Sequence, residues 1–137
     1  MAKCLEVISL LFGQLAAGVG VVRFEVTEDA SDLPVPCRIH LTNAEGEAQK
    51  PEHLPFHFDH FTCPGTAELN LPKGRYVYEI ERGPERTMAQ GEVVVHEGAV
   101  TVAAKLHRLV DMPALGWWPG DLHVHRPLDD MPLLVMA

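Results

Sequence analysis

The sequence predicts a mostly β fold: a small antiparallel β-sandwich followed by the beginning of a truncated α/β barrel. Apolar and polar residues alternate along several short segments between residues 19 and 109, as expected of strands with one buried face. Turn-forming clusters of Gly, Pro and Asn separate these segments. After residue 110 the pattern changes to a short histidine-bearing segment and then to residues suited to a helix, which is typical of a βα unit.

The alternating segments are short, and each is expected to form one strand. They cover residues 22–27, 37–42, 67–71, 75–81, 93–95 and 100–107, with turn clusters at 43–46, 72–74, 83–84 and 97–98. A single sheet with one wet face would leave their apolar side chains uncovered, so a second sheet is required. The side chains expected in the core are Val22, Phe24, Val26, Cys37, Ile39, Leu41, Ala67, Leu69, Leu71, Tyr76, Tyr78, Ile80, Val93, Val95, Val100, Val102, Ala104 and Leu106. The sandwich is expected to span residues 19–110.

The length and charge of the chain limit what it can bind. Its 137 residues fit one small globular unit rather than two. Eleven basic residues against nineteen acidic ones give a net charge of −8, which argues against nucleic acid and anionic membranes as partners. Eleven Pro and eleven Gly favour short elements over long helices.

Residues 1–18 fit two interpretations. Lys3 precedes the apolar stretch Leu5–Leu15 and a group of small residues, which is the outline of a signal peptide. Glu6 interrupts that stretch, so a lead-in helix or strand is the alternative. Export and a cytoplasmic location therefore both remain open. The stretch is too short to form a transmembrane span.

Two of the three cysteines are expected inside the sandwich. Cys4 would leave with a cleaved signal peptide, and Cys37 and Cys63 would remain as a pair. In an exported protein we expect the two to lie close in space and to be able to form a disulfide. In a reduced compartment they are simply small buried residues.

The segment 51–64 is the least regular part of the sandwich. Its candidate metal ligands are His53, His57, Asp59 and His60. Prolines in the segment exclude a helix that would align them, and an extended chain aligns only His57 with Asp59. Solvated loop histidines are therefore favoured over a metal site. His40, His96 and His107, on the polar faces of strands, are weaker candidates still.

The C-terminal part carries the more specific chemistry. Residues 111–120 are expected to form a linker, with Trp117 and Trp118 at least partly buried against the sandwich. In a strand over 122–125, His123 and His125 project from the same side and can reach one cation. Asp121 can orient a histidine or bind the ion itself. A helix is expected over 131–137, with Asp130 as its cap.

The string GWWPGDLHVHR at residues 116–126 resembles the opening metal motif of the PHP-type metallohydrolases, especially the CehA/McbA-like group. Members of this group resemble a β-sandwich followed by a PHP barrel, so the resemblance extends over residues 19–137. Looser patterns upstream also resemble the accessory sandwich of that group, at residues 37–39, 63–65, 71–76 and 82–85.

The resemblance implies a divalent metal, either zinc, manganese or iron, held by His123 and His125 with Asp121, and hydrolysis of a bond such as a phosphate ester. A barrel of this kind needs some two hundred residues or more, yet seventeen residues follow Gly120, so most of the barrel is missing. The expectation is a fragment that binds metal weakly and is inactive alone. Its expected partner is the rest of the barrel, or a second copy bound through the apolar C-terminus. The alternative is a non-catalytic β-sandwich that binds a ligand or a partner.

Overall fold

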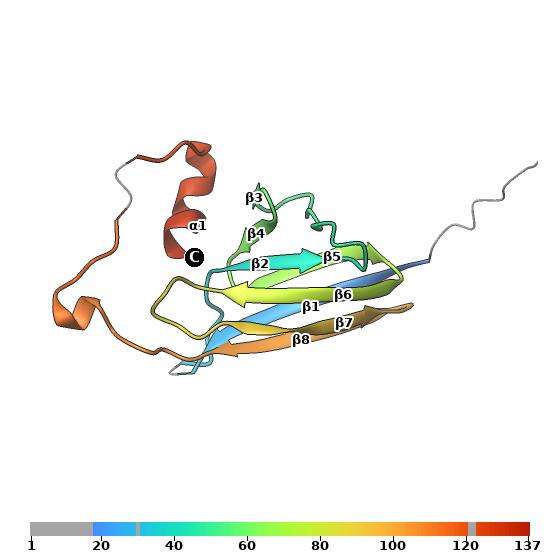
Figure 1. Ribbon diagram of the computed structural model, residues 1–137, viewed down its shortest axis with the longest axis horizontal. Helices are drawn as coiled ribbons and strands as arrows, with labels where there is room; N and C mark the ends of the chain where they lie inside the picture. Colours follow the sequence, from blue (N-terminus) through green and yellow to red (C-terminus); the bar gives the residue numbers. More distant parts are fainter. Residues whose placement is uncertain (1–17, 30, 121–122) are drawn as a thin grey trace, which may run out of the picture.

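The protein is a two-layered β structure. The computed structural model describes residues 18–29, 31–120 and 123–137; the signal-peptide prediction and Asp121 lie outside the described residues. One sheet has the strand order β5-β1-β8, and the other has the order β3-β4-β2-β6-β7 (Figure 1). The predicted mainly-β fold is thus confirmed. The strands are β1 (Val19–Glu28), β2 (Cys37–Thr42), β3 (Phe56–His57), β4 (His60–Cys63), β5 (Thr66–Pro72), β6 (Gly74–Glu81), β7 (Ala89–Val95) and β8 (Ala99–Leu106).

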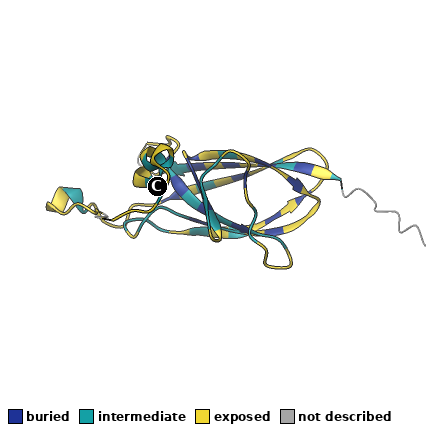
Figure 2. Ribbon diagram, turned by 90° about the horizontal axis from the view of Figure 1, so that it is seen from above, coloured by how far each residue is buried: buried dark blue, intermediate teal, exposed yellow. Residues whose placement is uncertain are grey.

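The core lies between the two sheets, as the alternation predicts. Phe24 of β1 is 1% exposed and packs edge-on against Phe61 of β4 and Tyr78 of β6, with ring centroids 6.2 and 6.1 Å apart. Each fully buried apolar side chain contributes about 1.5–3 kcal/mol relative to an exposed one. All the predicted core residues are either buried or packed against the core. Figure 2 shows the buried residues, in dark blue, along the strands.

One strand pair differs from the predicted antiparallel arrangement. β1 and β8 pair in parallel, with Phe24 opposite Val102, whereas the other pairs are antiparallel. The reason is topological: the chain passes through the second sheet between these two strands, so no tight turn forces them to run in opposite directions. The alternation of apolar and polar residues along a strand is the same in parallel and antiparallel pairs, so it does not predict the direction of this pairing.

The start of β1 lies in close contact with the end of β7, a strand of the other sheet. A Cβ atom on Gly20 would lie 2.0 Å from the carbonyl oxygen of His96, which follows β7. The amide of Val21 donates a hydrogen bond to the carbonyl of Gly98 at 2.8 Å. Only glycine fits this contact, because any side chain would push the two sheets apart.

The C-terminal part differs from the sequence-based expectation in two respects. Residues 123–125 are not in a strand, so the predicted strand over 122–125 is wrong in its described part. Trp117 and Trp118 are 69% and 78% exposed, so the expected burial is also wrong. The physical reason is that the linker leaves the sheets after Met112, whose amide donates a hydrogen bond to the Glu85 carboxylate, and then loops outward (Figure 1).

The chain returns to the sandwich through a short helix. Two 3₁₀ turns, η1 (Pro113–Leu115) and η2 (Leu128–Asp130), precede α1 (Met131–Met136), which contacts β4. Asp130 occupies the predicted cap position without a side-chain hydrogen bond, because its backbone is already helical and Pro132 has no N–H to offer. No helix in the described residues has the length and apolar character needed to cross a membrane.

Candidate metal centres

The predicted histidine pair converges. The Nε2 atoms of His123 and His125 lie 2.6 Å apart, and their ring centroids lie 4.5 Å apart. Both side chains are exposed on the segment that leads to α1. The pair thus forms without the strand on which its prediction depended, because a short irregular segment can also turn alternate side chains to one side. The predicted third member, Asp121, lies outside the described residues.

The donor set of this pair fits a divalent ion only in part. Imidazole nitrogens suit zinc and iron, and two of them on a tetrahedral ion would lie about 3.3 Å apart. The two exposed rings would need to separate by several tenths of an ångström, which a small side-chain rotation provides. A retained zinc usually needs three or four protein ligands. The described residues of this segment supply two.

A second cluster lies on the outer face of the five-stranded sheet. It consists of His40 on β2, His60 on β4 and Asp59 in the turn between β3 and β4, and one possible ligand atom of each lies within 4.8 Å of the others. The strand register explains it, because His60 is the direct partner of His40 on one side and of His57 on the other. Directly opposed residues share a face of the sheet and lie within reach of each other.

The carboxylate of Asp59 bridges the two imidazoles of this cluster. Its Oδ1 lies 3.0 Å from Nδ1 of His60, and its Oδ2 lies 3.4 Å from Nδ1 of His40. The two rings are 5.0 Å apart. The side chains of His40 and His60 are 27% and 20% exposed, while that of Asp59 is 65% exposed. The two histidines are therefore partly buried, and the cluster is open to solvent on the Asp59 side.

The turn between β3 and β4 places this carboxylate. Phe58 has φ of +53°, an unusual conformation for a bulky residue, and its side chain is 84% exposed. The amide of Asp59 donates a hydrogen bond to the carbonyl of His57 at 2.7 Å. This tight reversal returns the chain at once into β4, so that Asp59 lies beside His60 instead of projecting away from the sheet.

Charges around the cluster favour an ionised Asp59. The hydrogen bond with His60 lowers the pKa of the Asp59 carboxyl, and the charge of His40 lowers it further. Partial burial lowers the pKa of His57, and the positive charge of Arg126 contributes to that shift. Arg126 follows His125 directly, so the segment with the histidine pair comes near the β3–β4 hairpin.

The outer nitrogen of His40 also faces a carboxylate. Its Nε2 lies 3.8 Å from Oε1 of Glu81 on β6, and Arg38 holds the same oxygen at 3.5 Å. Carboxylates commonly orient metal-binding histidines through the ring nitrogen that does not bind the ion. His40 thus presents its other nitrogen, Nδ1, to Asp59.

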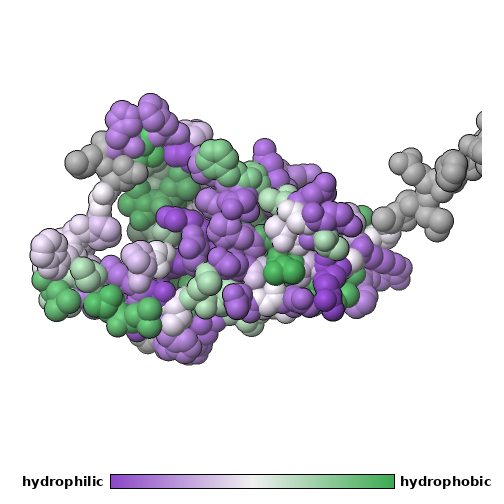
Figure 3. Space-filling view, in the orientation of Figure 1, coloured by the Kyte–Doolittle hydropathy of each residue, from purple (hydrophilic) through white to green (hydrophobic). Residues whose placement is uncertain are grey.

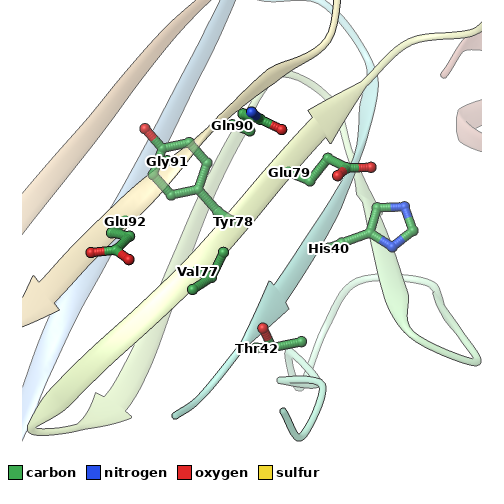
Figure 4. Close-up of a pocket in the computed structure, with 8 residues that line it drawn as sticks. All are labelled: His40, Thr42, Val77, Tyr78, Glu79, Gln90, Gly91 and Glu92. Carbon is green, nitrogen blue, oxygen red and sulfur yellow. The ribbon is translucent and has the colours of Figure 1, made fainter.

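A shallow groove of about 500 Å³ continues from this cluster across the sheet. Figure 4 shows His40 and Glu79 side by side on β2 and β6, and Tyr78 crossing to Gly91 of β7. A Cβ on Gly91 would lie 2.5 Å from the Tyr78 hydroxyl, so this glycine makes room for the ring. The groove is lined by His40, Thr42, Val77, Tyr78, Glu79, Gln90, Gly91 and Glu92.

The histidines of the segment 51–64 do not all lie where the sequence-based expectation placed them. His53 is almost fully exposed beside Glu52 and lies outside the three-residue cluster. His57 lies next to His60, and Asp59 belongs to the turn rather than to the same strand face as His57. His40, which ranked among the weakest candidates, is a full member of the cluster.

The comparisons with known proteins do not define a family. No family model matches the chain, and no curated protein matches it. Among solved structures, one described as "The Bacillus anthracis TIE protein" is similar, with a TM-score of 0.46 and 15% sequence identity. The match covers 66% of this chain and 17% of that chain, so this chain spans less than a fifth of the matched protein.

Proposed function

We propose that this chain is the amino-terminal part of a metal-dependent hydrolase of the PHP type. In this proposal the sandwich is an accessory domain, and residues 121–137 begin the catalytic domain. The observation that carries the proposal is the convergence of His123 and His125, whose Nε2 atoms lie 2.6 Å apart. Their surrounding string, GWWPGDLHVHR, resembles the opening metal motif of that group.

His123 and His125 would hold one divalent cation, and Asp121 would orient an imidazole or act as a third ligand. A divalent cation bound in such a site lowers the pKa of a bound water, which supplies a nucleophile at neutral pH. By analogy with the group, the substrate is a phosphate ester or a similar hydrolysable bond. The later ligands and the substrate-binding walls would come from the rest of the barrel.

The exposed apolar surface of the linker supports this arrangement. Trp117, Trp118 and Leu115 are each more than 60% exposed. In Figure 3 apolar surface, in green, follows the linker at the lower left. Large aromatic side chains are costly to leave in water and are typical of surfaces that pack against a partner. The remaining catalytic domain is the partner that the proposal assigns to them.

Metal titration of the full chain tests the proposal. We expect weak binding of Zn²⁺ and Mn²⁺ at this pair, easily reversed by a chelator, because two ligands are too few for tight retention. Binding at this pair is measured in a His40→Gln, His60→Gln background, which removes the second histidine cluster. In that background zinc binding should disappear when His123→Gln, His125→Gln is added and persist when His96→Gln is added. We expect no hydrolysis of a generic phosphoester by the chain alone. Zinc binding that is equal in all these proteins would contradict the assignment of these ligands.

A non-catalytic binding module is the second candidate function. The groove of about 500 Å³ beside His40 favours it, because binding sites are concave and lined by a few polar groups. The coding sequence after Ala137 separates the two candidates. Further His, Asp and Glu residues at the ends of predicted barrel strands would support the hydrolase. A stop codon directly after Ala137, together with a folded product, would support the non-catalytic binding module.

A further inference from the structure

We propose that His40, Asp59 and His60 form a zinc site on the sandwich itself, with one coordination position left open. The proposal does not depend on the hydrolase assignment, because the three residues belong to the sheet and its hairpin. It assigns a second metal centre, distinct in its ligands from the His123–His125 pair.

The two contacts that Asp59 makes with the histidines are close to the separations of a zinc site. Ligand atoms around a tetrahedral zinc lie about 3.3 Å apart, given bonds of about 2.0–2.1 Å. The contacts of Asp59 with His60 and His40, at 3.0 and 3.4 Å, are already near this value. All three donors lie within 4.8 Å, so the widest separation needs to close by about 1.5 Å. Small rotations about the side-chain bonds achieve this without moving the backbone.

The sheet holds the ligands in place before any metal binds. His40 and His60 are direct partners in the ladder between β2 and β4, where the next inward pair, Ile39 with Phe61, is fully buried. The carboxylate of Glu81, which lies 3.5 Å from Arg38, faces the outer nitrogen of His40 at 3.8 Å. Carboxylates in this position commonly orient a metal-binding histidine. A site built on rigid strands loses little entropy when it binds.

The ligand count and the surroundings indicate an accessible zinc ion. Three protein ligands with an open fourth position characterise zinc sites that bind water or a small anionic ligand, whereas closed structural sites use four. Asp59 contributes one negative charge, and Glu79 and Glu81 lie on the neighbouring strand, so a cation is favoured here. The open position would face the solvent-exposed Asp59 side.

Zinc competition with a chromophoric chelator at about neutral pH tests this site in the full chain. We expect His40→Gln, His60→Gln to bind zinc about 100-fold more weakly than wild type, or worse, since even an outer partner of a ligand contributes 10–100-fold. Asp59→Asn, on the exposed turn, should bind about tenfold more weakly. His96→Gln is the matched control and should stay within about twofold of wild type.

A second readout uses Co²⁺ in place of zinc. Tetrahedral Co²⁺ absorbs strongly in the visible range, and we expect this band in wild type and in the His123→Gln, His125→Gln variant. It should be absent from the His40→Gln, His60→Gln variant, whose β-sheet circular dichroism should match that of wild type.

The outcomes separate the two metal proposals. Tight zinc binding that survives in His40→Gln, His60→Gln would overturn the sheet site. Loss of zinc only in His123→Gln, His125→Gln would also overturn it, while supporting the hydrolase ligands. Loss only in the sheet variant would establish the sheet site and count against metal binding by the other pair.

Discussion

The ladder between β2 and β4 brings the thiols of Cys37 and Cys63 together. They are direct partners in that ladder, both fully buried, and their Sγ atoms lie 3.5 Å apart. The hydrogen bond between the two sulfurs and burial both raise the pKa of the Cys37 thiol, which disfavours its reaction with external reagents. The two cysteines are both close together and buried, so their positions fit the exported and the reduced alternative equally. The two thiols are therefore protected from solvent but ready to oxidise to each other.

Oxidation is expected to join Cys37 to Cys63. The positions are 26 residues apart, and closing a loop of that size stabilises the folded state by about 3.5 kcal/mol in the chain-entropy model. Alkylation under denaturing, non-reducing conditions should find both thiols blocked in oxidised protein, and urea unfolding should shift to higher concentration. Two freely alkylated thiols after complete oxidation would contradict this pairing. Cys37→Ala provides the control, because it cannot form the bridge.

Tyr76 fixes the turn between β5 and β6. Its hydroxyl donates a hydrogen bond to the carbonyl of Pro72 at 2.9 Å, and the residue is 4% exposed. Tyr76→Phe should lower the free energy of unfolding by about 1 kcal/mol, because it removes this hydrogen bond and keeps the ring. Chemical denaturation of both proteins at neutral pH measures the difference. Equal stability would mean that the hydrogen bond contributes nothing.

The difference in stability between wild type and Tyr76→Phe is expected to depend on pH. Burial raises the pKa of the Tyr76 hydroxyl, and the charge of Glu45 adds to the shift. A raised folded-state pKa means that this contribution is fully present below the unfolded value near about pH 10 and is lost as pH rises through the folded pKa. The advantage of wild type over Tyr76→Phe should therefore shrink above about pH 10. An advantage that grows with pH would contradict this sign.

At the scale of elements, the contact of β1 with the end of β7 depends on Gly20. Gly20→Ala should destabilise the fold by about 1–3 kcal/mol, because its Cβ would overlap the carbonyl oxygen of His96. Gly120→Ala is the matched control, since no atom lies within 4 Å of the position that its methyl group would take and its φ is ordinary. Its effect should stay within about 0.5 kcal/mol. Thermal unfolding of the two variants checks the contrast, and equal effects would refute it.

The longer strands and the C-terminal helix α1 could be predicted from the sequence, whereas β3, β4 and the irregular conformation of residues 123–125 could not. Alternation identifies a strand with one wet face, and β2 and β6 follow it closely. β3 has two residues and lies among prolines, so it offers no period to detect. In β4 the outward Thr62 is buried, which hides the alternation. The alternation in β1 and β8 does not indicate whether the two strands pair in parallel or antiparallel.

At the scale of the whole molecule, the His123–His125 pair was accessible to sequence reasoning because its members lie two residues apart. The sheet cluster does not follow from the alternation alone, because His40 and His60 lie on two strands whose register the alternation leaves open. The sequence did contain a signal. Once Cys37 is taken to face Cys63, counting along antiparallel strands places His40 opposite His60, as the ladder shows. Asp59 then follows from the short turn before β4.

Anomalous diffraction at the zinc absorption edge, from crystals of the full chain grown with zinc, tests most directly whether this mainly-β protein binds metal at its histidine clusters. The expected map has its strongest peak bonded to His40, Asp59 and His60 at about 2.0–2.2 Å. A weaker peak is expected between His123 and His125, where fewer ligands are available. A map with no peak at either cluster, or with zinc only at exposed side chains such as His53 and His96, would contradict both assignments.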